Sequence, residues 1–400
     1  MKEFSPIEYL KIDISNCYGN DKLTWEERLN WFEQNEPVLE SYFNTADAPA
    51  LYYAGVRAFR KHQNNPNYTN TYPISLDATS SGTQLMAVLT GDRLAASCCN
   101  VLNTGTREDC YTKIYKKFAA IVGNNPLITR DKVKKAIMTA NYGSQATPRE
   151  LFGKYIDVFE EIMSAQCPYV WELNKFLLKA WNNKINQYGW IMPDNFHVHV
   201  KVYQKIKEEF AFMNKAYSFI HEENQPSDYG RAYSANCIHS TDAMVMREVC
   251  TMAMHNPEQI DKIKNLLNQK VINKEPVNKK NLNMVKTLVQ RYKDSGFLSA
   301  RILNYIDSCS FVLVPREPLE ELINNLPARP FEVICIHDSF RVLPNYGNDI
   351  RRLYIYQLYK LGRSNLLEFI LTQLLGTKIT INKGDPNMYK EILDSEYALS

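Results

Sequence analysis

The stretch EVICIHDSFRVL, residues 332–343, decides the fold, because it places three polar residues between two apolar runs. A strand, a turn and a second strand are the simplest interpretation, since Asp and Ser bond their own backbone and favour turns. The alternative makes Asp338 a half-buried metal ligand at a strand end, because a buried carboxylate needs a partner. On this stretch alone the simple turn is favoured, and the rest of the chain has to decide.

The composition is typical of a globular protein, with 45% hydrophobic and 23% charged residues among 400. The formal net charge of +3 creates no overall field that requires a nucleic-acid partner, so any basic surface is local. Nine scattered cysteines without a Cys-x-x-Cys pair predict reduced thiols and a cytoplasmic location. Early charges and short apolar runs exclude a signal peptide and a membrane span, so we expect a soluble chain with no membrane partner.

Helical patterns dominate the chain and strands are few. The expected elements are helices over 25–62, 80–91, 107–123, 129–143 and 236–255, strands at 74–77 and on both sides of Asp338, and a hairpin or long loop at 189–235. The fold class is therefore α+β, mostly helical, with a small antiparallel sheet.

Asp77 stands where the apolar strand ISLD (74–77) meets a helix. The ordinary interpretation is a helix-capping Asp. Ser80 or Ser81 is better placed to cap, so Asp77 is left without a capping role. A carboxylate at this position points out of the end of the sheet.

The helix at 129–143 carries Arg130, Lys134, Met138 and Tyr142, each four residues apart. Steps of four drift by only about 40° on a helix, so these side chains share one broad face. A solvated basic stripe is one interpretation. The other is that the two cations are free to meet an anion, because the apolar side of the helix lies elsewhere. Two cations facing two carboxylates suit chemistry on a triphosphate with a divalent metal.

Three motifs in order resemble the phage-type single-subunit RNA polymerase family: DATSSGTQ (77–84), RDKVKKAIMTANYG (130–143) and IHDSF (336–340). The resemblance implies a right-hand polymerase palm and fingers and a DNA-directed RNA polymerase that uses a DNA template and nucleoside triphosphates to make RNA. In this interpretation His337-Asp338-Ser339 is both a turn and a metal site. A bacteriophage origin would place the protein in the host cytoplasm.

The resemblance also implies roles for single residues. Asp77 and Asp338 would hold two Mg²⁺ ions for nucleotidyl transfer, with the backbone carbonyl of Ala78 beside them. Lys134 would bind the triphosphate and act as proton donor to pyrophosphate. The substrate-binding positions implied by the family are Arg130, Met138, Tyr142, Gly143, His239 and Tyr111.

Weaker matches extend the resemblance along the chain. Residues 196–235 are similar to the loop that reads promoter bases in the family, and ILDSEYALS (392–400) is similar to its C-terminal foot, which packs near the active site. His239 matches a histidine that contacts the ribose 2′-hydroxyl, which can donate and accept a hydrogen bond. That histidine, His-Asp-Ser and Asp-Ala-Thr favour ribonucleotides over deoxyribonucleotides. A DNA polymerase or primase of the same fold and a non-catalytic nucleic-acid-binding scaffold are the alternatives.

The resemblance starts late relative to the family, so its N-terminal domain and thumb are expected to be absent here and to be supplied by a second polymerase subunit, as in a split heterodimer. The predicted divisions are palm start (1–123), fingers (124–255), a basic helical insertion (256–330) and palm with foot (331–400). The insertion could contact nucleic-acid backbone, grip the partner or bind a recruiting protein. It could equally be a solubilising surface.

Overall fold

The computed structural model describes residues 1–65, 67–123, 125–126, 128–228, 232–269 and 278–400. Over these residues the protein is mostly helical, and its strands form one three-stranded and two two-stranded sheets, all antiparallel. The expected α+β class with small antiparallel sheets is confirmed. None of the helices in this described part combines the length and apolar character needed to cross a bilayer.

The three-stranded sheet joins distant parts of the chain in the order β1-β7-β6. Its strands are β1 (Ile74–Asp77), β6 (Ile334–Ile336) and β7 (Ser339–Val342). Ile74, opposite Val342, and Leu76, opposite Phe340, are buried with their partners. Apolar residues at every second position thus hold one face of the sheet in the core.

The turn between β6 and β7 confirms the strand-turn-strand interpretation of 332–343. Ile336 pairs with Ser339, so His337 and Asp338 form a two-residue connection. His337 has a φ of 54°, in the left-handed region that two-residue hairpin turns require. Asp338 is half-buried at the strand end, as the alternative interpretation also expects.

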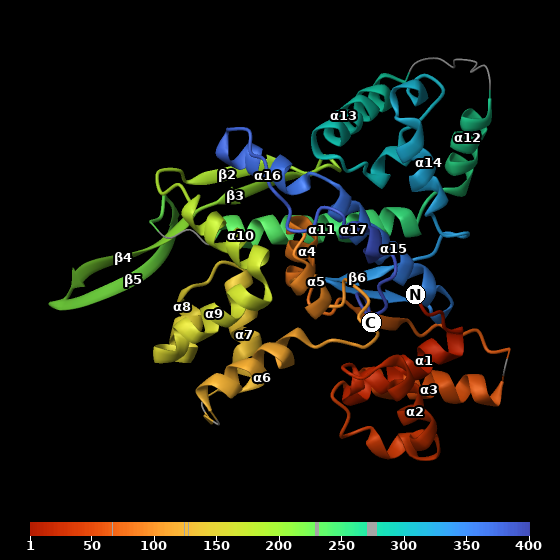
Figure 1. Cartoon of the computed structure of the whole chain (residues 1–400), viewed down its shortest axis with the longest axis horizontal. Helices are drawn as coiled ribbons and strands as arrows, with labels where there is room; N and C mark the ends of the chain where they lie inside the picture. The colour runs from red at the N-terminus through yellow and green to blue at the C-terminus, as the bar shows by residue number, and fades with distance from the viewer. Residues whose placement is uncertain (66, 124, 127, 229–231, 270–277) are drawn as a thin grey trace.

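Three helices pack together behind this sheet: α4 (Ser81–Thr90), α11 (Ala232–Ala253) and α15 (Gly347–Arg363). They are seen at the centre of Figure 1. Helix α15 is buried on nearly all sides, and Tyr354 on it donates to the buried Gln84 on α4. Ser80 occupies the predicted N-cap position of α4, but among the described residues its hydroxyl bonds the Thr83 and Tyr111 side chains instead of a backbone N–H.

A layer of short helices lies along one side of the centre. It consists of α5 (Arg93–Cys98), α6 (Cys110–Val122), α7 (Arg130–Asn141), α8 (Ala146–Phe152), α9 (Ile156–Gln166) and α10 (Pro168–Lys179). The predicted end signals hold here. Gly123 and Gly143 follow α6 and α7 with φ of 80° and 81°, and the Thr129 side chain accepts from Lys132 N at the start of α7.

The N-terminal residues form a lobe with its own buried cluster. Helices α1 (Pro6–Ser15), α2 (Trp25–Asn35) and α3 (Pro49–Asn64) enclose Leu10, Phe32 and Tyr52. Short helical turns connect them at η1 (Asn16–Asn20) and η2 (Glu36–Tyr42). Helix α1 also packs against β1, so the lobe closes one side of the central sheet.

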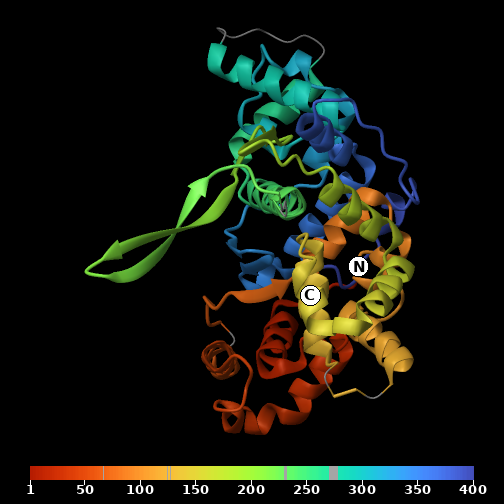
Figure 2. The ribbon, with the colours of Figure 1, turned by 90° about the vertical axis from the view of Figure 1, so that its left-hand side faces the viewer.

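Residues 187–224 form two consecutive hairpins where one hairpin or a loop was expected. The first pairs β2 (Gln187–Ile191) with β3 (His197–Lys201), and the second pairs β4 (Tyr203–Phe212) with β5 (Lys215–Asn224). Both views show the β4–β5 ribbon projecting from the body (Figures 1 and 2). Its side chains are almost all exposed or partly exposed. Residues 229–231 of the expected loop lie outside the described residues.

The predicted insertion at 256–330 is mostly helical where described, and 270–277 lie outside the described residues. It contains α12 (Pro257–Asn268), α13 (Lys279–Ser295) and α14 (Arg316–Asn324), with short turns at η4 (Ala300–Asn304) and η5 (Phe311–Leu313). Its apolar side chains, such as Ile263, Leu288 and Phe297, belong to the same buried cluster as the centre of the molecule. The remaining elements are η3 (Gly153–Tyr155), η6 (Pro344–Tyr346), α16 (Leu366–Leu375) and α17 (Tyr389–Ile392).

The C-terminal tail returns to the central sheet. Ser400 N donates to Asp77 O over 2.9 Å and Thr79 N donates to Ala398 O over 3.3 Å, so the tail lies antiparallel to the residues that follow β1. Gln84 donates to the Ala398 carbonyl from beneath, over 2.9 Å. The tail therefore forms part of the wall around Asp77.

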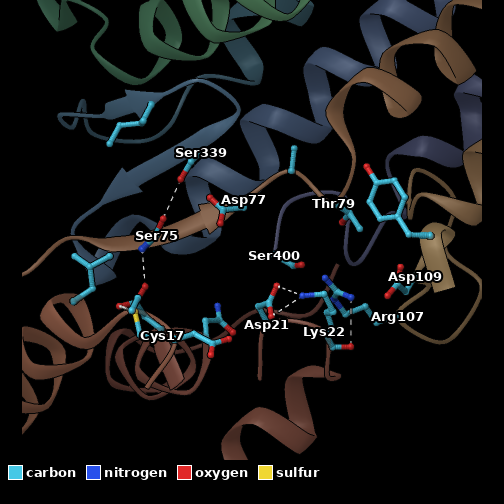
Figure 3. A pocket seen from close by; sticks show the side chains of 18 of the residues that line it. Cys17, Asp21, Lys22, Ser75, Asp77, Thr79, Arg107, Asp109, Ser339 and Ser400 are labelled. Atoms are coloured by element: carbon cyan, nitrogen blue, oxygen red, sulfur yellow. Dashed lines mark hydrogen bonds and ion pairs between the residues drawn. The ribbon is translucent and has the colours of Figure 1, made fainter. Parts of the chain in front are cut away.

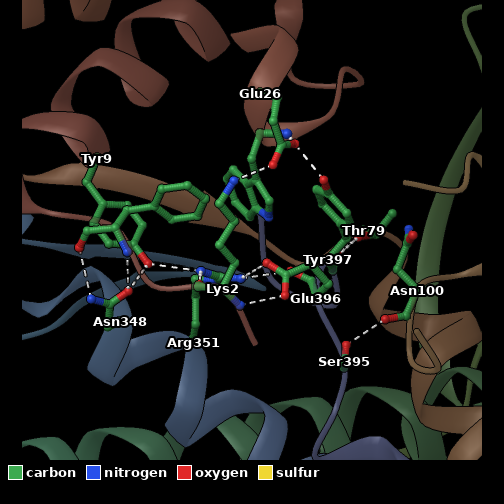
Figure 4. A network of polar contacts seen from close by, with 12 residues as sticks. Lys2, Tyr9, Glu26, Thr79, Asn100, Asn348, Arg351, Ser395, Glu396 and Tyr397 are labelled. Atoms are coloured by element: carbon green, nitrogen blue, oxygen red, sulfur yellow. Dashed lines mark hydrogen bonds and ion pairs between the residues drawn. The ribbon is translucent and has the colours of Figure 1, made fainter. Parts of the chain in front are cut away.

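Arg351 on α15 links the two chain termini to the core (Figure 4). Its fully buried guanidinium donates to the carbonyls of Lys2 and Glu396 and pairs with the Glu396 carboxylate over 3.0 Å. It also lies 4.7 Å from the ring centroid of Trp25. A buried cation is tolerated here because carbonyls, a carboxylate and an aromatic ring all face it.

We expect Arg351→Met to lower the free energy of unfolding by about 3–5 kcal/mol, because the change leaves buried acceptors and a carboxylate without their donor. Arg352→Met is the matched control, since Arg352 is 52% exposed and its ion pairs with Glu3 and Asp349 lie at the surface. Surface pairs contribute about 1 kcal/mol or less. Urea unfolding of both variants measures the difference, and equal losses would contradict the assigned role of Arg351.

Candidate active site

Two adjoining cavities open at the ends of β1 and β7. The first encloses about 630 Å³ and the second about 370 Å³. Ala78, Thr79, Tyr111 and Lys134 line both, so these residues form the boundary between them. The first cavity also contains Asp77 and Arg130, and the second also contains Met138, Tyr142, His239 and Asp338. Residues predicted from separate motifs thus converge on one place.

The sheet register brings Asp77 and Asp338 to neighbouring strand ends. Asp77 is paired with Ser339, and Ala78 N donates to the Asp338 carbonyl over 3.2 Å. Beside Asp77 the Ser75 and Ser339 hydroxyls lie 3.0 Å apart, a contact drawn in Figure 3. The two aspartates come from motifs far apart in the sequence, and the ladder makes them neighbours.

The electrostatics of this pair favour a bound cation. The Asp77 side chain opens into the first cavity, yet the protein around it still raises the pKa of its carboxyl, chiefly by desolvation and further by the negative charge of Asp338. Hydrogen bonding from Ser339 offsets part of that rise in the pKa. The bonds between tail and sheet use the carbonyls of Asp77, Ala398 and Ser400, and among the described residues no backbone N–H donates to the Ala78 carbonyl, which can therefore serve as a further oxygen ligand. An all-oxygen set of this kind fits Mg²⁺.

Helix α7 presents its predicted face to both cavities, but its members differ in what they contact. Lys134 is exposed, with its ammonium 5.8 Å from the ring centroid of Tyr111. The prediction that Arg130 is free to meet an anion is wrong, because Arg130 pairs with Asp109 over 2.6 Å and donates to the Thr112 hydroxyl over 2.8 Å. Binding of an anion by Arg130 would require exchange of this ion pair.

Tyr142 and His239 stack on each other inside the second cavity. Their ring centroids are 4.7 Å apart with an interplanar angle of 6°. Burial lowers the pKa of His239, and the neighbouring His337 lowers it further, so the imidazole is neutral near pH 7. A neutral imidazole can both donate and accept a hydrogen bond.

Met138 and Gly143 occupy different surroundings, although both were predicted to bind substrate. Met138 is 42% exposed and lines the second cavity. Gly143 is buried, and among the described residues it ends α7 behind Tyr142 without belonging to the lining of either cavity. Its φ of 81° allows the chain to turn sharply after Tyr142, which is a supporting role.

Asp242 is a further carboxylate that the sequence analysis missed. It lies on α11 three residues after His239 and lines the second cavity with Asp338. Burial and the charge of Asp338 raise the pKa of Asp242 to about 6. The spacing His239-x2-Asp242 puts both side chains on one helix face, and that signal could have identified it.

Asp13 is a second missed carboxylate, on α1 behind β1. Its oxygens accept from Ser75 N and from the Tyr72 hydroxyl, each over 2.7 Å. Burial raises the pKa of Asp13 to about 6, even though both hydrogen bonds act in the opposite direction. An acid inside the apolar run Ile12-Asp13-Ile14 was the available signal. Asp13 thus fixes β1 against the N-terminal lobe.

Comparison with known proteins identifies relatives of part of the chain. Residues 4–188 match the family described as DNA-dependent RNA polymerase. A probable DNA-directed RNA polymerase of Neurospora crassa is 28% identical over 173 residues, which cover 38% of this chain and 19% of that protein. The DNA-directed RNA polymerase of Enterobacteria phage K11 is 25% identical over 173 residues, or 40% of this chain and 18% of the relative. T7 RNA polymerase of Escherichia phage T7 is 25% identical over 150 residues, or 34% of this chain and 16% of the relative.

These similarities span less than a fifth of the length of each relative. The matched region includes the first two motifs and the N-terminal lobe, and it ends before His239 and Asp338. The contribution of the third motif to the site therefore rests on the geometry described above.

The raised pKa of Asp13 predicts a pH-dependent stability. A carboxyl whose pKa is about 6 when folded and about 3.9 when unfolded stabilises the protein below pH 4, and this stabilisation is lost as the pH rises toward 6. We expect the stability of the wild type relative to Asp13→Asn to fall by about 2–3 kcal/mol between pH 4 and pH 7.

Urea unfolding at a series of pH values measures this difference. Asp261→Asn is the control, since Asp261 is exposed on α12 and should leave the difference from wild type nearly constant with pH. A difference between wild type and Asp13→Asn that does not change with pH would contradict the assignment.

Proposed function

We propose that this chain, which over residues 4–188 is related to the DNA-dependent RNA polymerases, is the catalytic part of a DNA-directed RNA polymerase. The observation that carries the proposal is the pairing of β1 with β7. It places Asp77 and Asp338 at adjacent strand ends, beside cavities that also hold Lys134, Tyr142 and His239. The chain matches at most 19% of the length of each of these three relatives. Their similarity supports a relationship to the polymerase family, and the activity of this chain has to be tested by experiment.

Asp77, Asp338 and the Ala78 carbonyl are the residues that would hold Mg²⁺. When bound, two such ions lower the pKa of an RNA 3′-hydroxyl and neutralise the charge on pyrophosphate as it leaves. The chain's own part is to keep two carboxylates at a fixed spacing by strand pairing. Because the strand pairing holds the carboxylates in place before the substrate binds, they need no rearrangement to reach the positions that the reaction requires.

Lys134 is the cation best placed for a triphosphate, since it is exposed and lines both cavities. An ammonium there would attract the phosphates and could give a proton to the leaving pyrophosphate. Arg130 would join it only after its ion pair with Asp109 opens. We propose that a triphosphate, which carries more charge than one carboxylate, favours that exchange.

The second cavity is the proposed place for the ribose and base of the incoming nucleotide. Tyr142 and His239 form one stacked wall of this cavity, and Met138 lines it as well. A neutral His239 can bond a 2′-hydroxyl, which a deoxyribonucleotide lacks. The proposed substrates are therefore ribonucleoside triphosphates.

The division into palm, fingers and insertion, and the resemblance of 196–235 to a promoter-reading loop, remain part of the proposal. So does a second polymerase subunit that would supply an N-terminal domain and thumb. Co-purification from the native source tests the subunit directly. A partner that is required for activity and is recovered in equal amount would support it.

Asp338→Asn is expected to reduce extension of an RNA primer on a DNA template by at least about 1000-fold, because a neutral amide cannot replace a carboxylate in holding Mg²⁺. The assay uses the chain with its co-purifying proteins, Mg²⁺ and ribonucleoside triphosphates. The control is Asp261→Asn, which changes an exposed carboxylate on α12 and should keep full activity. Undiminished extension by the Asp338→Asn variant would reject the proposed metal site. A wild-type chain that is inactive even with its partner would favour the alternative of a non-catalytic nucleic-acid-binding scaffold.

His239→Ala is expected to lower the preference for ribonucleotides over deoxyribonucleotides by about 5- to 150-fold, which corresponds to a lost hydrogen bond of about 1–3 kcal/mol. Single-nucleotide incorporation with matched ribo- and deoxyribonucleotides measures it. His197→Ala, on β3 outside both cavities, is the control. An unchanged ratio would show that His239 does not read the 2′-hydroxyl.

A further inference from the structure

A pair of thiols lies outside the two cavities but on elements that support them. Cys250 on α11 and Cys335 on β6 have their sulfur atoms 3.2 Å apart. Both are half-buried, as is Cys309, whereas the other six cysteines are buried. The sequence pattern predicted only isolated reduced thiols, because 85 residues separate this pair.

The backbone around the pair is already held together. Phe331 N donates to Ala253 O over 2.8 Å, so the segment that enters β6 is attached to the last turn of α11. A disulfide bond is about 2.05 Å long, so the sulfur atoms must approach by roughly 1.1 Å from their separation of 3.2 Å. Forming the bond therefore requires an approach of this size by the side chains or the local backbone.

A cavity gives small molecules access to Cys250. It encloses about 450 Å³ and is lined by Cys250, Phe196, Arg247 and Arg301, among others. Arg247 lies one helical turn before Cys250 and lines the same cavity, where its guanidinium pairs with the Asp194 carboxylate. The hydrogen bond with Cys335 lowers the pKa of Cys250 and raises that of Cys335. Cys250 is thus the thiol better suited to attack.

We propose that Cys250 and Cys335 form an oxidative modification site, in which a small disulfide such as glutathione disulfide converts the two thiols into an intramolecular disulfide. The Cys250 thiolate attacks one sulfur of glutathione disulfide, whose S–S bond breaks and releases one glutathione thiolate. The Cys335 thiolate then attacks the Cys250 sulfur of this mixed disulfide and expels the second glutathione thiolate. Two protein thiols are oxidised, and glutathione disulfide is reduced to two glutathione molecules, which take up the two protons.

The new bond would connect two walls of the second cavity. Cys335 is three residues before Asp338, and α11 carries His239 and Asp242 in addition to Cys250. The disulfide would therefore restrain the β6–β7 turn relative to α11. This site depends only on the two thiols and their access, so it holds or fails independently of the proposed polymerase activity.

The test incubates the full chain in glutathione buffers of increasing oxidised fraction, traps free thiols by alkylation and maps peptides by mass spectrometry. We expect the Cys250 and Cys335 peptides to become cross-linked with a loss of about 2 Da, reversibly with dithiothreitol. Hydrogen exchange at 334–342 should slow upon oxidation, because the strand is then tied to α11.

Two variants identify the pathway. Cys309→Ser, which changes the other half-buried thiol, should form the cross-link as the wild type does. Cys335→Ser should stop at a mixed disulfide of Cys250 with glutathione. Two results with the wild-type chain would overturn the proposal. In one, both thiols remain open to alkylation in excess glutathione disulfide. In the other, only the mixed disulfide on Cys250 forms. The wild-type peptide map decides this without reference to the variants.

Discussion

The antiparallel pairing of β1 with β7 is the contact on which the candidate site depends. It joins residues such as Ser75 and Ser339, which are 264 positions apart. A shift of one residue in this register would exchange the two faces of the strand and turn Asp77 toward the core. Burial of Ile74, Leu76 and Phe340 prevents that shift, because it would expose them. The same apolar contacts that stabilise the sheet therefore also aim the carboxylate.

Several acidic side chains lie around this strand pairing, where their charged forms are disfavoured. Asp13, Asp77 and Asp242 all have raised pKa values, and desolvation by the surrounding protein is the main cause for each. Structural ion pairs in the same protein, such as Arg351 with Glu396, are built so that opposite charges meet. Concentrated, poorly compensated carboxylates are instead typical of places that receive a cation or a substrate.

Local signals in the sequence predicted the local features well. The Thr129 cap and the turns after Gly123 and Gly143 depend on a few neighbouring residues, and the two strands around Asp338 depend on apolar runs on either side of a polar break. Features that depend on distant partners were missed. Nothing near Arg130 announces its ion pair with Asp109, and the Ser80 hydroxyl is drawn away from its cap by Tyr111. The raised pKa of Asp242 could not be predicted either, because part of it comes from the charge of Asp338 in the β6–β7 turn, which is distant in the sequence.

The β4–β5 ribbon has a mechanical consequence. Ten paired residues in each strand make an arm roughly 33 Å long that is attached to the body at one end (Figure 2). A rotation of about 10° at the base would sweep the tip through roughly 6 Å, by the geometry of an arm of that length. Small adjustments of the β2–β3 hairpin, from which the arm extends, are thus magnified several-fold at Met213 and Asn214. If the base rotated in this way, the tip of the ribbon would move through a much larger volume than its base.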